Sequence, residues 1–275
     1  MSQASGHAPA AAAARDPAQV GGPATLAPET AAIGRSLRVY YAPGRAAALD
    51  GFLARFLGKG ELGFDVGAHV GDRTASFRRL GARAVAVEPQ PRLHRLLRRL
   101  FGRDPGTALV QSLIGSQGGQ GRLHLNTANP TVATASAGFI AAAAGAPGWQ
   151  DQVWDRSIEL PVTTLDALIE THGTPDFIKL DVEGFEAAAL TGLSAPVRSL
   201  SFEFTTLQRA TALDALRRLE ALGADYSFNA CLGEAMHFAL DAPVHAGTLA
   251  RWLEDLPDAA NSGDVYASLE PGRVT

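Results

Sequence analysis

Hydrophobic positions along the chain follow two alternating periods. Short apolar runs typical of buried strands are followed by segments with apolar residues three and four positions apart, which predict helices. The expected strands cover residues 61–66, 83–89, 107–115, 121–126, 157–165, 176–181 and 197–204, with a closing hairpin of strands 226–231 and 235–240. The expected helices cover residues 72–80, 91–100, 165–172, 185–193 and 212–223. This alternation predicts an α/β protein with a doubly wound, mostly parallel sheet covered on both faces.

Two segments precede the alternation. Residues 1–30 are rich in Ala, Pro and Gly, and we expect a disordered tail because they have little apolar surface to bury. The folded domain is then expected over 31–275. A helical lead-in over 45–57 is predicted from four apolar residues at helical spacing. These residues are Leu49, Phe52, Leu53 and Phe56.

Composition narrows the class of protein. The chain has 46% hydrophobic and 19% charged residues and a net charge of −4, which is typical of a soluble globular protein without a general attraction to nucleic acid. Its single cysteine, Cys231, excludes an internal disulfide and is expected to be buried. No apolar run reaches transmembrane length and no secretory signal opens the chain. We expect a cytoplasmic protein with no membrane span and no nucleic-acid partner.

The helix expected over 91–100 combines two kinds of side chain. Its leucines are expected on the buried side, at Leu93, Leu96, Leu97 and Leu100. Its arginines, with one just beyond it, are expected to form a solvated face, at Arg92, Arg95, Arg98, Arg99 and Arg103.

Carboxylates follow most of the expected strands. In an open doubly wound sheet the ligand lies beyond the carboxyl ends of the strands. These ends carry Asp65, Glu88, the segment 112–115, Asp181 with Glu183, and Glu203. Four of the five positions therefore present acids, whereas the strand bodies are almost wholly apolar.

The most informative of these positions is the glycine turn "DVGAHVG" over residues 65–71. It lacks both the G-x-G-x-x-G of dinucleotide-binding proteins and the Lys-Ser/Thr of a phosphate-binding loop. A helix N-terminus attracts anions, but Asp65 would repel a bare phosphate. A ligand with both a carboxylate and a cationic group suits the turn better. Glu88 can accept hydrogen bonds from ribose hydroxyls, a feature that nicotinamide enzymes share.

The segments "FDVGAHVGDRT", "AVEPQP", "VTTLDAL" and "DFIKLDVEGFEAAALTGL" together resemble the S-adenosylmethionine-dependent methyltransferases of the FkbM type, over roughly residues 61 to 204. The resemblance implies the class I methyltransferase fold, a Rossmann-like seven-stranded sheet whose last strand is antiparallel. It also implies S-adenosylmethionine as cofactor, which has an amino acid moiety, a cationic sulfur and a ribose but no phosphate.

The resemblance places the cofactor on particular residues. It implies that the methionine part is lined by Asp65, Gly67, Ala68 and Gly71, and that Glu88 holds the ribose. The adenine pocket is expected after the third strand, at Ser112, Leu113 and Ile114, where an acid or amide of the family pattern is missing. Thr74 is expected either to touch the cofactor carboxylate or to lie on the surface.

Catalytic residues are expected in "IKLDVEG" and "SFEF". Lys179, Asp181 and Glu183 alternate and would share one face of a strand. Asp181 is expected near the transferring methyl group, while Glu183 and Lys179 orient or activate the acceptor; a buried Lys–Asp pair bracing the sheet is the structural alternative. Glu203 is the other candidate base. Two carboxylates alone are a weak signal for a divalent cation, and no metal is expected.

These expectations favour O-methylation of a hydroxyl on a small molecule or glycan. A nicotinamide-dependent oxidoreductase and a non-catalytic scaffold of the same fold are the alternatives. Substrate recognition is expected in an insertion over about 121–160, with acceptor contacts at Asn129, Thr131 and Ser136. Its two tryptophans, Trp149 and Trp154, either line the substrate pocket or pack a lid.

Overall fold

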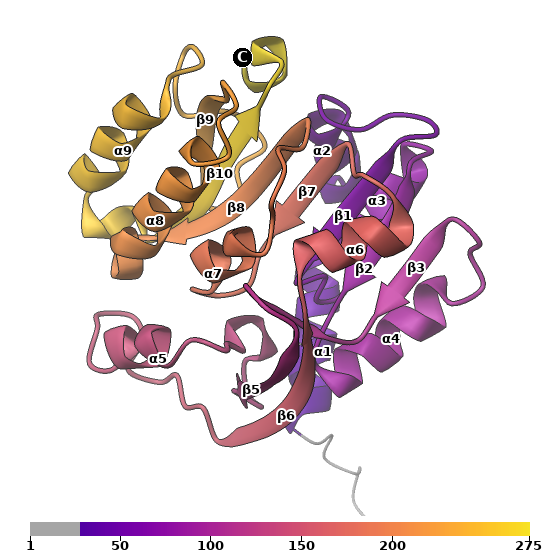
Figure 1. Ribbon diagram of the computed structural model, residues 1–275. Helices are drawn as coiled ribbons and strands as arrows, with labels where there is room; N and C mark the ends of the chain where they lie inside the picture. The colour runs from indigo at the N-terminus through magenta and orange to yellow at the C-terminus, as the bar shows by residue number, and fades with distance from the viewer. Residues whose placement is uncertain (1–27) are drawn as a thin grey trace, which may run out of the picture.

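The computed structural model describes residues 28–275, so most of the tail expected over 1–30 lies outside the described residues. Its centre is a seven-stranded sheet with the order β3-β2-β1-β7-β8-β10-β9 (Figure 1). The strands are β1 (Leu62–Val66), β2 (Arg83–Val87), β3 (Thr107–Val110), β7 (Phe177–Leu180), β8 (Ser199–Thr205), β9 (Ser227–Leu232) and β10 (Ser262–Ser268). Neighbours pair in parallel except β10, which is antiparallel to β8 and β9. The mostly parallel seven-stranded sheet is confirmed.

Helices cover both faces of this sheet (Figure 1). They are α1 (Pro28–Tyr40), α2 (Arg45–Leu53), α3 (Asp72–Arg79), α4 (Pro91–Phe101), α6 (Leu165–His172), α7 (Glu186–Thr191), α8 (Arg209–Glu220) and α9 (Ala246–Asp255). Side chains of α6 to α9 form one apolar core with Ile178 and Leu180, whereas α2 and α3 form another with Phe177. Because strand side chains alternate between faces, Lys179 lies on the α2–α3 face.

The third expected strand is in fact two strands in different sheets. β3 ends at Val110, and β4 (Leu113–Ile114) belongs to a second sheet of order β4-β6-β5. The Ser112 hydroxyl donates to the carbonyl oxygen of Pro161 at 2.8 Å, which draws the chain away from the main sheet. β5 (Gly119–Leu125) pairs antiparallel with β6 (Arg156–Thr163). Between them lie the short 3-10 turn η1 (Pro130–Val132) and helix α5 (Ala137–Ala143).

The expected closing hairpin is wrong in its second strand. Residues 235–240 form no strand and contact β9 through isolated hydrogen bonds, such as that from Ala239 N–H to the Ala230 carbonyl at 2.7 Å. The antiparallel partner of β9 is β10, which follows α9 and inserts between β8 and β9. Its sequence, "SGDVYAS", contains Gly, Asp and two Ser, residues that are poor indicators of a strand. Cys231 of β9 is buried and free, as expected.

Two other details differ at the helices. Helix α1 begins at Pro28, so the last three residues of the expected tail are helical. On α4, Leu93 and Leu97 are buried, but Leu96 is only half-buried and Leu100 is 48% exposed. The apolar stripe instead continues four residues after Leu97 at the partly buried Phe101. The lead-in helix is confirmed, with Leu49, Phe52, Leu53 and Phe56 all buried. Within residues 28–275, no helix combines the length and apolar composition needed to span a bilayer.

Candidate active site

A cleft of about 830 Å³ opens at the carboxyl ends of β1, β2 and β7. This is the edge where strand order reverses, between β1 and β7, and where ligands of doubly wound sheets bind. Eight of the twelve expected site residues line the cleft: Gly67, Ala68, Glu88, Ser112, Leu113, Ile114, Asp181 and Glu183. The other four, Asp65, Gly71, Lys179 and Glu203, do not line it.

The glycine turn brings two strand ends into close contact. Gly67 has a φ of 86°, and a Cβ built on it would lie 1.8 Å from the carbonyl oxygen of Asp181. Only glycine permits both that conformation and that approach. Gly71 has a different role, because a Cβ there would meet Phe101 and Leu97 of α4 at 2.6 and 2.7 Å. Gly71 therefore lets α3 and α4 pack together behind the cleft.

Replacing Gly67 with alanine should lower the free energy of unfolding by roughly 2–5 kcal/mol. This range is the sum of two costs: the strain of a left-handed backbone at a residue with a Cβ, and the displacement of the Asp181 backbone. Gly44 is a matched control: its φ is 84°, but nothing lies within 4 Å of its Cβ position. Gly44→Ala should cost only about 1 kcal/mol. Urea unfolding of both variants measures the difference. Equal losses of stability would show that the close approach to Asp181 does not affect the free energy of unfolding.

Glu88 directly follows β2, and each of its carboxylate oxygens accepts a hydrogen bond from a backbone N–H group. Oε2 accepts the His69 N–H and Oε1 accepts the Gln90 N–H, each at 2.8 Å. Burial raises the pKa of Glu88 to about 8, although these two hydrogen bonds act in the opposite direction. Each oxygen keeps lone-pair capacity toward the cleft, which suits a pair of ribose hydroxyls.

Asp65 lies beneath the cleft. Its side chain points to the α3 face of the sheet, is 1% exposed and accepts the Thr74 hydroxyl at 2.5 Å. Burial raises its pKa to about 6 despite the bond from Thr74. The contact in the structure thus joins β1 to the first turn of α3, and direct contact between Asp65 and a cofactor stays a prediction.

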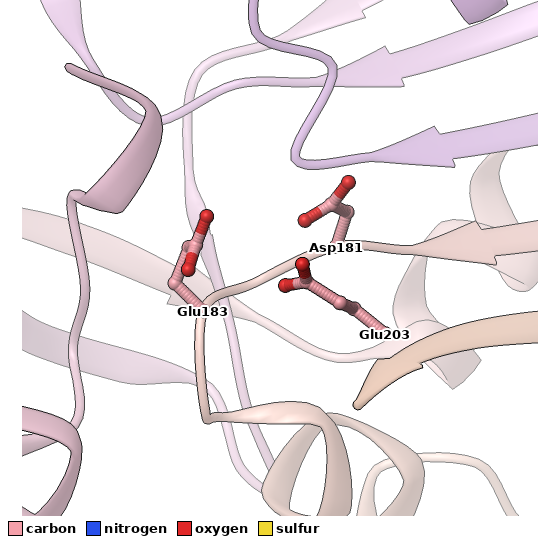
Figure 2. Close-up of side chains that lie close together, drawn as sticks. All are labelled: Asp181, Glu183 and Glu203. Carbon is pink, nitrogen blue, oxygen red and sulfur yellow. The ribbon is translucent and has the colours of Figure 1, made fainter. Parts of the chain in front are cut away.

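Three carboxylates converge beside the cleft. One oxygen each of Asp181, Glu183 and Glu203 lies within 4.8 Å of the other two, and Figure 2 shows the three groups facing one another. Burial and the charge of Asp181 raise the pKa of Glu183, and burial with the charges of Glu183 and Asp181 raises that of Glu203. Burial alone would raise the pKa of Asp181, but the Lys179 ammonium holds it below its ordinary range.

The turn that carries Glu183 differs from the expected strand. β7 ends at Leu180, and Glu183 has a φ of 52°, so the three residues of the motif do not share a strand face. The Glu186 carboxylate accepts the Val182 and Gly184 N–H groups at 3.1 and 3.3 Å, and the Thr134 hydroxyl donates to the Glu183 carbonyl at 2.6 Å. These bonds fix the turn in a strained conformation at the cleft. Oxygen ligands at the spacing of the three carboxylates also suit a divalent cation, and the expectation of no metal stays a prediction.

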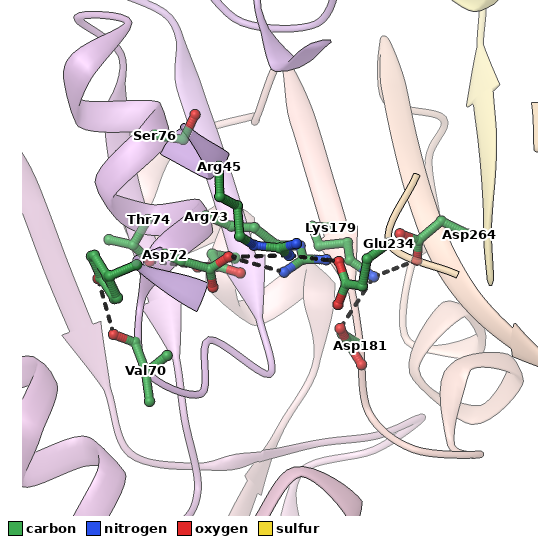
Figure 3. Close-up of polar contacts among 12 residues, drawn as sticks. Arg45, Val70, Asp72, Arg73, Thr74, Ser76, Lys179, Asp181, Glu234 and Asp264 are labelled. Carbon is green, nitrogen blue, oxygen red and sulfur yellow. Dashed lines mark hydrogen bonds and ion pairs between the residues drawn. The ribbon is translucent and has the colours of Figure 1, made fainter. Parts of the chain in front are cut away.

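Lys179 belongs to a buried ion-pair network behind the cleft (Figure 3). Its Nζ lies 2.6 Å from Asp264 Oδ1 of β10 and 3.3 Å from Asp181 Oδ2. Its side chain lines a small internal cavity between the sheet and helices α2 and α3, with Ser201 and Tyr266. This arrangement matches the structural alternative of a Lys–Asp pair that braces the sheet.

Several cleft residues were missed from the sequence. Arg73 of α3 lines the cleft and lies 3.3 Å from Glu234 Oε2, a partner 161 positions away. Tyr40 of α1 also lines it, with its ring 5.4 Å from that of His69 in an edge contact. His69 of the glycine turn has a φ of 49° and a buried Nε2 without a partner among residues 28–275. Burial lowers its pKa to about 4, so the ring is neutral at neutral pH.

The insertion contributes one wall of the cleft. Thr131 lines it with Pro130 and Ala133, whereas Asn129 bonds to Thr131 and Ser136 caps α5. The two tryptophans pack edge-on against buried Phe139, and neither is among the cleft residues. Their arrangement matches packing within the insertion.

Comparison with known proteins identifies the family. A model of the methyltransferase FkbM domain matches residues 65–227, which is more than half of the chain and includes the glycine turn, Glu88 and the three carboxylates. The chain belongs to the FkbM methyltransferase family. It is an S-adenosylmethionine-dependent methyltransferase. No curated protein matches the sequence.

Solved structures with a similar fold share few identical residues with this FkbM-family methyltransferase. One is a TehB-like SAM-dependent methyltransferase from Corynebacterium glutamicum, with 11% identity over 86% of this chain and 95% of that chain and a TM-score of 0.44. An O-methyltransferase from Bacillus cereus in complex with SAH has 11% identity over 87% and 91%, with a TM-score of 0.40. A precorrin-6y C5,15-methyltransferase from Geobacter metallireducens has 12% identity over 81% and 86%, also with a TM-score of 0.40.

The cleft of the methyltransferase fits S-adenosylmethionine. Glu88 directs open acceptor capacity into it, and the acids near Asp181 suit a cationic sulfur. The buried His69 Nε2 is a further polar atom available to a ligand.

Proposed function

We propose that this methyltransferase transfers the methyl group to a hydroxyl of a small molecule or glycan. The observation that carries the proposal is the convergence of three carboxylates at the cleft. When bound, S-adenosylmethionine supplies a methyl group on a cationic sulfur, and transfer to a hydroxyl oxygen leaves a neutral thioether and one proton to be removed. A hydroxyl acceptor therefore needs a base close to its oxygen.

We assign the roles as follows. Glu88 holds the ribose, and the wall formed by Ser112, Leu113 and Ile114 holds the adenine. Ionised Asp181 faces the cationic part of the cofactor. Glu183 orients the acceptor and takes its proton, because it lines the cleft and its raised pKa brings its basicity closer to that needed near neutral pH.

Glu203 lies beside Asp181 and Glu183 but outside the cleft lining, so it acts on the acceptor through Glu183. Lys179 has no surface in the cleft, so its role is to keep Asp181 ionised. Asp65 and Gly71 support the cofactor turn through their contacts with Thr74 and with α4.

Glu183→Gln should lower the rate of methyl transfer by about 10²–10⁴-fold, the usual contribution of a general base, while S-adenosylmethionine still binds. The source-cell extract is incubated with the enzyme and methyl-labelled donor, and mass spectrometry and NMR locate the label. Glu170→Gln, on the exposed side of α6, is the control and should retain the full rate.

Label on carbon or nitrogen rather than oxygen would overturn the proposed O-methylation. Full activity of Glu183→Gln would instead exclude Glu183 as the base. Loss of activity on adding EDTA, restored by magnesium, would show that the carboxylates act through a divalent cation.

A further inference from the structure

One face of helix α4 carries an unusual concentration of positive charge. Thirteen consecutive residues, 91–103, contain five arginines and no acid, in a chain whose net charge is −4. These residues are Arg92, Arg95, Arg98, Arg99 and Arg103, and all five are exposed. Their charge is therefore available to a partner in solution.

The part of the chain that the structure describes neutralises little of this face. Among residues 28–275, Arg92 pairs with Glu29 at 2.9 Å, and the other four arginines make no ion pair. The segment before residue 28 contains one acid, Asp16. Four guanidinium groups thus keep their full hydrogen-bonding capacity toward an external anion.

The arrangement on the helix is regular. At 100° per residue, Arg92, Arg95 and Arg99 form a stripe opposite the buried Leu93 and Leu97. Leu100, 48% exposed, lies about 80° from Arg92 at the margin between this stripe and the buried Leu93. Helix α4 packs on the edge strand β3 at the outside of the molecule (Figure 1). The face is therefore a convex helix surface.

We propose that this arginine face docks the enzyme on an anionic phospholipid surface. Guanidinium groups form paired hydrogen bonds with phosphate oxygens, and each basic residue near an anionic bilayer adds to the attraction. Burying an exposed leucine in the lipid interface lowers the free energy of binding. A sugar–phosphate backbone offers no apolar surface to the same leucine. The combination of arginines and Leu100 therefore favours a lipid surface over a nucleic acid. This inference is independent of the acceptor proposed above.

The test is co-sedimentation of the full chain with vesicles. We expect binding to vesicles of equal parts phosphatidylglycerol and phosphatidylcholine, weakening as salt is added, and no binding to phosphatidylcholine alone. Arg95→Gln/Arg99→Gln should weaken binding roughly 25-fold, at about fivefold per arginine. Leu100→Ser should weaken it severalfold without changing the charge.

A matched control removes the same charge elsewhere. Arg156→Gln/Arg251→Gln changes two exposed arginines on β6 and α9 and should leave vesicle binding within about twofold of wild type. Retained S-adenosylmethionine binding by calorimetry shows that each variant is folded. The proposal is overturned if wild type ignores anionic vesicles, if the α4 double variant binds like the control, or if duplex RNA binds instead with no effect of Leu100→Ser.

Discussion

Replacing Lys179 with methionine should lower the free energy of unfolding by roughly 3–5 kcal/mol, the cost of leaving a buried charge unpaired. Lys179 is 2% exposed, and its ammonium is shared between Asp264 and Asp181. Burial disfavours the ammonium, but the two carboxylates outweigh it and raise the pKa of Lys179. Methionine fills similar space without the charge, so the lost stability measures the electrostatic contribution of the ammonium group. Urea unfolding at neutral pH measures it.

Two further variants separate this effect from general disruption. Lys179→Met/Asp264→Leu removes charges of both signs and should recover much of the lost stability. Arg122→Met breaks the Arg122–Glu159 pair, whose side chains are 63% and 57% exposed, and should cost no more than about 1 kcal/mol. A Lys179→Met variant as stable as Arg122→Met would contradict the bracing role of the network.

Cofactor affinity should rise with pH, by roughly tenfold per unit below about pH 8. Glu88 has its pKa raised to about 8 by burial, so it holds a proton at neutral pH in the free enzyme. If the ribose hydroxyls are held by the ionised carboxylate, binding releases that proton, and a process that releases protons is favoured as pH rises. Calorimetry from pH 6 to 8.5, in buffers of different ionisation enthalpy, measures both affinity and released protons.

The same titration of Glu88 has the opposite effect on the folding stability of the cofactor-free protein. Between the ordinary value of 4.5 and about 8, the folded state holds a proton on Glu88 that the unfolded state has lost. The stability of the free protein therefore falls as pH rises through this window. Saturating cofactor should offset that fall, because it binds the ionised form.

Carboxylate variants and two different ligands show which carboxyl group releases each proton. Glu88→Gln should abolish the pH dependence that S-adenosylmethionine and its demethylated product share. Glu186→Gln should keep it, although burial raises the pKa of Glu186 to about 7, because Glu186 is not among the cleft residues. Additional protons released only with the cationic cofactor would come from Glu183 and Glu203. A pH-independent affinity in wild type would contradict the assignment of Glu88 to the ribose.

The sequence predicts the parts of the fold that depend on local pattern. The β1–α3 turn, the strand before Glu88 and helix α6 follow from apolar periodicity and glycine placement, and the first two place Gly67, Ala68 and Glu88 at the cleft. Strand β10 was missed because its stability comes from two flanking strands rather than from its own composition.

Site residues that depend on distant partners were harder to predict. Alternation gives the face of a side chain, but it does not reveal what covers that face. Lys179 was therefore assigned to the acceptor, although Asp264, 85 positions away, holds it beneath the sheet. Arg73 reaches the cleft within a network that includes Glu234 on a distant loop. His69 is half-buried with its Nε2 covered, and Tyr40 of α1 packs against its ring, a contact that the sequence of a single loop does not reveal.

The short strand β4 serves two structures at once. Leu113 and Ile114 form part of the cleft wall and also the edge of the small sheet that frames residues 126–155. Loops within that frame can lengthen or change composition while this part of the cleft wall stays anchored to β6. With the acceptor and adenine contacts that we propose, such a layout allows acceptor preference to diversify during evolution without re-optimising the binding of the methyl donor.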